Sequence, residues 1–136
     1  MPPPLAEDQW RTLQSFRVAL KRYLDWSEDQ AASVGLTAAQ YQLLITIRGH
    51  AGNGDPTITD VARALFIRHH SAVGLVDRAV ATGLVERYRD EADQRLVRLA
   101  LTPIGHDRVN GLAPAHLEEL RRLAPLLDAL VAAGRE

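Results

Sequence analysis

The most informative region of the sequence is Thr57 to Gly105, and its clearest part reads Gly83-Leu84-Val85-Glu86-Arg87, then Asp93-Gln94-Arg95, then Leu101-Thr102-Pro103-Ile104-Gly105. Gly83 follows a helical pattern and is typical of the residue just after a helix. Residues 84–89 and 96–101 are patterned as strands, and the polar residues 90–94 between them predict a turn. Thr102-Pro103 then predicts a helix start, with a capping hydroxyl before a proline.

Two short helices are predicted immediately before this hairpin. Thr57-Ile58 can add a very short strand, and Thr59 is a suitable N-cap for the first helix. Residues 66–67 form the expected turn, and the second helix runs from Arg68 to about Thr82, with an apolar side made of Ala72, Leu75, Val76, Ala79 and Val80. Helix, turn, helix and hairpin are the parts of a winged helix-turn-helix, which can contact two neighbouring grooves of DNA.

Longer helices are predicted on both sides of this region. An amphipathic pattern over residues 6–32 ends at Gly35, and Thr37-Ala-Ala-Gln40 is a capping box that starts a further helix ending by Gly49. A last helical pattern runs from Pro103 to the end of the sequence. Pro114 and Pro125 lie inside it, and each is expected to kink or divide it.

The apolar stripes of the flanking helices are longer than a small winged-helix lobe, residues 37–101, can cover. We therefore expect residues 5–32 and 103–136 to form a homodimer, most simply with two-fold symmetry. The alternative is that these helices pack only on each other within one chain.

The composition is that of an ordinary globular protein. The 136 residues are 46% hydrophobic and 24% charged, with no cysteine for a disulfide or a thiolate metal site. The sequence lacks a membrane-spanning apolar run and a signal-peptide pattern, so we expect a soluble, cytoplasmic protein. A net charge of −1 does not by itself favour nucleic acid, so any DNA binding requires a local patch.

Taken together, these motifs resemble the MarR family of winged helix-turn-helix transcriptional regulators. The resemblance rests on the ordered set Thr59-Asp-Val-Ala62, Leu75-Val76-Asp77-Arg78, Gly83-Leu84-Val85-Glu86-Arg87, Asp93-Gln94-Arg95 and Leu101-Thr102-Pro103-Ile104-Gly105. It implies a mainly α fold with a small β-hairpin, a winged helix-turn-helix flanked by dimerisation helices. It also implies a DNA-binding homodimer, often a repressor relieved by a small, frequently aromatic ligand. The sequence departs from the family pattern at Arg68, Gly74 and Gln94, where a serine or threonine cap and two arginines are usual.

The DNA contacts are expected at the start of the second helix and at the hairpin tip. Arg95 can enter a minor groove, with Asp93 holding its guanidinium or the turn. The positive end of the helix suits a phosphate, and its first turns reach base edges. The expected contacts are Arg68, His69, His70, Ser71, Val73, Gly74, Arg89, Asp93 and Arg95. The alternative for the charged residues is ordinary solvated surface.

A ligand site is a weaker prediction. Trp10, Tyr23, Trp26, Tyr41 and His50 can line an aromatic pocket near the dimer helices, although aromatic residues at helical spacing are more often core. The five histidines show no ligand spacing, so no metal or other cofactor is expected. No nucleophile elbow or phosphate loop is visible, so an enzyme is not expected.

The sequence therefore predicts a homodimeric regulator that binds a near-palindromic operator in double-stranded DNA and responds to a small-molecule effector. Two other classes stay open. One is a winged helix used for protein contacts without sequence-specific DNA binding, and the other is a sensor whose main function is to bind a metal or ligand.

Overall fold

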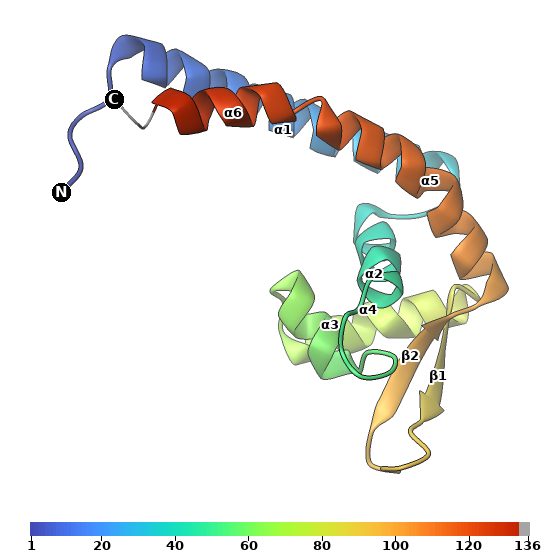
Figure 1. Cartoon of the computed structure of the whole chain (residues 1–136). Coiled ribbons are helices and arrows are strands. Elements are labelled where there is room, and N and C mark those ends of the chain that lie inside the picture. Colours follow the sequence, from blue (N-terminus) through green and yellow to red (C-terminus); the bar gives the residue numbers. More distant parts are fainter. Residues whose placement is uncertain (134–136) are drawn as a thin grey trace. The chain divides into compact units, whose positions relative to one another are not determined.

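The computed structural model describes residues 1–133, and its chain divides into two compact units. One comprises residues 31–112, and the other combines residues 1–30 with the segment that begins at Ala113. The elements in chain order are α1 (Glu7–Ser33), α2 (Ala38–Arg48), α3 (Ile58–Leu65), α4 (His69–Ala81), β1 (Val85–Arg89), β2 (Val97–Leu101), α5 (Pro103–Arg121) and α6 (Ala124–Ala133) (Figure 1). The expected fold class, mainly α with a small hairpin, is confirmed.

Local signals set the ends of several helices in the unit 31–112. Gly35 has a φ of +79° after α1, and Gly83 has a φ of +78° after α4, so both turns use a conformation that glycine tolerates. The capping box before α2 forms as predicted: the Gln40 backbone N–H donates to the Thr37 hydroxyl at 3.0 Å, and the Thr37 N–H donates to the Gln40 side chain at 3.0 Å. The start of α5 is also confirmed, since Thr102 Oγ1 accepts the N–H of Gly105.

The N-cap predicted for α3 is wrong by two residues. Thr57, not Thr59, caps the helix, because Asp60 lies three residues after Thr57 and closes a capping box with it. Thr59 lies inside the first turn and is exposed. The very short strand expected at Thr57-Ile58 is reduced to one isolated bridge between Thr57 and Arg98.

A single apolar core holds the helices and the hairpin of this unit together. The strands β1 and β2 pair antiparallel from Val85 opposite Leu101 to Arg89 opposite Val97. β1 contacts α4, and β2 contacts α2 and α3. The largest fully buried side chains are Leu43, Leu44, Val61, Val76, Val85, Leu99 and Pro56. This core fixes the hairpin beside the two short helices.

The other unit is built from most of α1, the second half of α5, and α6. Gln9 of α1 donates to the carbonyl of Ala133 at 2.6 Å. Pro114 lies inside α5 without ending it, and the break between α5 and α6 falls at residues 122–123. Pro125 therefore sits in the first turn of α6, where no backbone hydrogen bond is lost. None of the helices in residues 1–133 combines the length and the apolar character needed to cross a membrane.

This second unit leaves a large apolar surface exposed. No described residue of α6 is buried, and α1 buries only Ala31, which belongs to the other unit. The exposed large apolar side chains of this unit are Leu5, Trp10, Val18, Leu24, Leu117, Leu120, Leu127 and Val131, besides the terminal Met1. Trp10, Val18 and Leu24 line one groove along α1, and a contiguous apolar surface of this kind is typical of an interface.

Candidate nucleic-acid interface

The connection between α3 and α4 leaves the first helical turn of α4 exposed. Phe66 closes α3 in the left-handed conformation (φ +55°), and its N–H donates to carbonyls of the last helical turn. The Phe66 side chain is 96% exposed, so the turn is held by the backbone and not by burial of this ring. Arg68 then takes an extended conformation and starts α4 without a side-chain cap.

The predicted contacts at the start of α4 lie on its accessible side. Arg68, His69, His70 and Ser71 are all exposed, and Val73 and Gly74 are half-buried. Because no side chain caps the helix, its first backbone donors and its positive end are open to an anion. Arg68 adds a charge that is in no ion pair among the described residues.

Arg78 is a candidate contact that the sequence prediction left out. A Cβ built on Gly74 would lie 3.4 Å from Nη1 of Arg78, so the arginine side chain extends back over the glycine one turn earlier. Side chains four residues apart share a helix face, and helical side chains lean toward the N-terminus. The spacing from Gly74 to Arg78 was the signal that could have identified it. Like Arg68, it takes part in no ion pair within residues 1–133.

Arg95 is exposed to solvent and is held by Asp93. Its side chain is 90% exposed, and its Nε and Nη2 donate to the two oxygens of Asp93 at 3.0 and 3.1 Å. The Arg95 backbone N–H donates to the same carboxylate at 3.1 Å. These bonds, the side-chain pair first, hold the pKa of Asp93 below its usual range. The structure therefore brings together the arginine and the aspartate of the wing.

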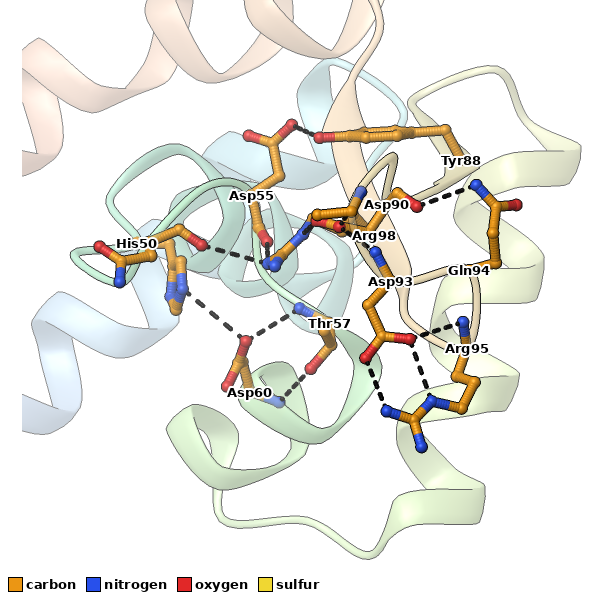
Figure 2. A network of polar contacts seen from close by, with 12 residues as sticks. His50, Asp55, Thr57, Asp60, Tyr88, Asp90, Asp93, Gln94, Arg95 and Arg98 are labelled. Carbon is orange, nitrogen blue, oxygen red and sulfur yellow. Dashed lines mark hydrogen bonds and ion pairs between the residues drawn. The ribbon is translucent and has the colours of Figure 1, made fainter.

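The base of the wing is held by Asp90 and Arg98. Arg98 Nε donates to Asp90 at 2.6 Å, and Arg98 Nη1 donates to the carbonyls of Asn53 and Asp55 (Figure 2). The bond from Arg98 is the main cause of a lowered pKa at Asp90. Arg89, a predicted DNA contact, instead uses Nη1 to bond the carbonyl of Gln94 across the tip.

The loop before α3 carries two more polar contacts with the same region. Tyr88 of β1 donates its hydroxyl to the Asp55 carboxylate, which raises the pKa of the tyrosine. His50 Nε2 lies 3.7 Å from Asp60, in the capping box of α3. The pKa of Asp60 is lowered, mainly by the backbone N–H of Thr57. His50 therefore lies beside the cap of α3.

The other residues predicted to line a ligand site have different local surroundings. Tyr41 of α2 is buried in the apolar core. Trp10 lines a groove along α1. Tyr23 and Trp26 lie together and are joined by buried His116, whose ring centroid is 4.8 Å from that of Trp26. The two aromatic residues border a groove of about 340 Å³ together with Ala19, Arg22, Glu119, Arg122, Leu123 and Leu126. The described residues contain no group of three or more His, Asp or Glu side chains placed to hold a metal ion.

Comparison with known proteins agrees with this architecture. Residues 34–96 match the MarR family. The chain is thus similar to this family over α2, α3, α4 and β1. A curated relative, the uncharacterized HTH-type transcriptional regulator YsmB of Bacillus subtilis (strain 168), is 34% identical over 68 residues. That match covers 50% of this chain and 47% of YsmB, so the chain aligns with about half of the relative's length.

Solved structures extend the likeness to most of the MarR-like chain. Staphylococcus aureus MepR in complex with DNA has a TM-score of 0.69 at 22% identity, covering 82% of this chain and 81% of MepR. Streptomyces coelicolor AbsC, a MarR family transcriptional regulator, has a TM-score of 0.70 at 22% identity, covering 90% and 82%. Bordetella bronchiseptica BpsR, whose DNA binding is regulated by 6-hydroxynicotinic acid, has a TM-score of 0.63 at 26% identity, covering 83% of each chain.

Proposed function

We propose that this chain is a homodimeric transcriptional regulator of the cytoplasm that binds a near-palindromic operator in double-stranded DNA. The observation that carries the proposal is that one compact unit presents both the uncapped, exposed start of α4 and the exposed, carboxylate-held Arg95. These are the two elements a winged helix places in neighbouring grooves.

Each element has a distinct role in this proposal. The first turns of α4, from Arg68 to Gly74, enter the major groove, where backbone donors meet phosphate and side chains meet base edges. Arg95 enters the adjacent minor groove, and Asp93 sets the direction of its guanidinium. Arg89 stabilises the tip by donating to the carbonyl of Gln94. Val73 and Gly74 are small, so the helix backbone can approach the bases closely.

Binding and its sequence dependence are tested directly. Purified protein is used to select genomic fragments, and the selected DNA is titrated in gel shifts over a series of salt concentrations. We expect inverted half-sites about 10 bp apart and an affinity that falls steeply with salt. Arg95→Ala should weaken binding roughly tenfold, whereas Arg121→Ala should not, because Arg121 is also exposed and carboxylate-paired but lies in the other unit. A protein-interaction module would select no sequence.

The dimer is supported by the exposed apolar side chains of the unit formed by α1 and the C-terminal helices. We expect Leu127→Glu together with Val131→Glu to produce a folded monomer in sedimentation equilibrium. Ile45→Glu is the matched control, since Ile45 is similarly exposed but lies on α2. A wild-type chain that sediments as a monomer would mean that the helices pack only within one chain.

We further infer that the groove beside Tyr23 and Trp26 takes an aromatic anion and that the anion relieves repression. The supporting observation is that the rings of Tyr23 and Trp26 and the side chains of Arg22 and Arg122 border one groove. Arg122 is paired there with Glu119 at 3.0 Å, whereas Arg22 is in no ion pair among the described residues. Burial raises the pKa of Tyr23, so its hydroxyl stays protonated and can donate to a carboxylate. Benzoate should raise the melting temperature and benzamide should not, and Arg22→Gln should abolish the difference. Equal effects of the two compounds would contradict the anion site.

A further inference from the structure

We propose that Arg98 and Asp90 are positioning residues that hold the wing arginine, Arg95, in a fixed place relative to the helix-turn-helix. They do so by joining the wing to the loop that precedes α3. We call the series of contacts from the loop through Arg98, Asp90 and Asp93 to Arg95 the relay. Its effect on affinity rests on the proposed DNA binding, but the contacts themselves can be tested without DNA.

The first step of the relay joins β2 to the loop. Arg98 has a side chain only 16% exposed, and its Nη1 donates to the carbonyl of Asp55 at 2.6 Å and of Asn53 at 3.2 Å. The guanidinium lies against Gly54, where a Cβ would be 3.6 Å from its central carbon. The Leu99 N–H reinforces the junction by donating to the carbonyl of Pro56 at 2.8 Å. The loop is thus bound to the strand on both sides of Gly54.

The second step passes through both oxygens of Asp90. One oxygen accepts Nε of Arg98, and the other accepts the backbone N–H groups of Ala92 and Asp93 at 2.9 Å each. This carboxylate is 19% exposed, so little of it is left to water. The Asp90 side chain therefore connects the half-buried Arg98 to the turn at the wing tip.

The third step reaches Arg95. Asp93, whose N–H is held by Asp90, accepts three bonds from the backbone and guanidinium of Arg95. Figure 2 shows the whole series from Arg98 to Arg95, beside the Thr57 and Asp60 capping box of α3. The loop ends at Thr57, the first residue of that capping box. The contacts of Arg98 with the loop therefore link the wing tip to the start of α3.

The physical need for such an anchor follows from the size of the hairpin. A two-stranded sheet is marginal by itself, and a long exposed side chain loses freedom when it binds. Holding Arg95 before DNA arrives removes part of that cost. Loosening the relay should therefore weaken operator binding by roughly 3- to 10-fold.

The test uses Arg98→Lys, which keeps the charge but cannot reproduce the fork of bonds to Asp90 and two carbonyls. Its effect on operator affinity is measured in the wild-type and in the Arg95→Ala background. In the wild-type background we expect Arg98→Lys to lower operator affinity by roughly 3- to 10-fold, with an unchanged salt dependence of binding. In the Arg95→Ala background we expect no further loss of affinity. Asp90→Asn should behave alike, because its amide can keep the turn bonds but not the ion pair.

Arg87→Lys is the matched control. Arg87 also lies on the hairpin and pairs with a carboxylate, Asp77 of α4, but it takes no part in the relay. An equal loss for Arg98→Lys in both backgrounds, or an Arg87→Lys effect that also disappears with Arg95→Ala, would overturn the proposed relay.

A second measurement separates failure of the relay from failure of DNA binding. NMR relaxation of the Arg95 Nε–H group is recorded on the free protein. Arg98→Lys should increase the mobility of that group, and Arg87→Lys should not. Unchanged mobility would overturn the relay even if the protein binds DNA, and increased mobility would uphold it even if no operator were found.

Discussion

Gly105 of α5 lies directly against the backbone carbonyl of Leu84, at the point where α5 passes the start of the hairpin. A Cβ built on Gly105 would be 2.2 Å from that oxygen, a distance that no ordinary contact allows. The same place is held by Thr102, which bonds the carbonyls of Gly83 and Leu84. The absence of a side chain at residue 105 is therefore what lets the helix start beside the wing.

Gly105→Ala should destabilise the fold. Because the clash is with backbone, the helix or the strand must move, and we expect a loss of about 1–3 kcal/mol in the free energy of unfolding. Gly111→Ala, in the same helix, has nothing within 4 Å of its Cβ and should stabilise by up to about 1 kcal/mol. Chemical denaturation measures both, and a neutral Gly105→Ala would mean that the two backbones are not in contact.

The capping residue of α3 can be identified by a pair of threonine substitutions. Thr57→Ala removes the acceptor for the Asp60 N–H and should cost about 1 kcal/mol. Thr59→Ala affects an exposed residue inside the first turn and should change stability by less than about 0.5 kcal/mol. The same denaturation experiment compares them, and a larger loss for Thr59→Ala would restore the cap expected from the sequence.

Arg78 should contribute to base selection if α4 enters the major groove. An arginine in that position favours guanine, and losing it costs about 1–3 kcal/mol of discrimination at one base pair in each half-site. Arg78→Ala should relax the selected sequence at that pair alone. An unchanged selected sequence in Arg78→Ala would remove Arg78 from the interface.

The wing should respond to acid in a defined range of pH. The pKa values of Asp90 and Asp93 are lowered in the folded protein, chiefly by Arg98 and Arg95. Their stabilisation is therefore complete above the unfolded pKa of about 3.9 and is lost as pH falls through the lower folded values. Asp90→Asn should make unfolding less dependent on pH below about 4. An identical pH dependence in the two proteins would contradict the ionic role of Asp90.

The sequence predicted the parts of the fold that depend on neighbouring residues. Gly83, the Thr37 capping box and the Thr102-Pro103 start each act over a few positions, and each formed where it was expected. The cap of α3 was misplaced because two threonines lie two residues apart. What favours Thr57 includes a bridge to Arg98, a residue far along the chain.

The candidate site was predictable to a smaller extent. Exposure of Arg68 to Ser71 and the pairing of Asp93 with Arg95 follow from the motif, although their contacts with DNA stay predictions. The role of Arg98 could not be predicted, because two of its three acceptors are loop carbonyls that no residue type signals. Helical periodicity likewise could not tell that Tyr41 lies in the core while Tyr23 and Trp26 meet His116.

The bridge between Thr57 and Arg98 also bears on how the protein acquires its shape. α3 has eight residues, too few to persist as an isolated helix in water. Its cap is tied to the last strand of the hairpin, so α3 gains its full support only after β2 has been synthesised and has docked. A nascent chain that ends before β2 would thus carry an incomplete helix-turn-helix. The first half of the motif and the wing are in this sense one cooperative folding unit, although they are distant in the sequence.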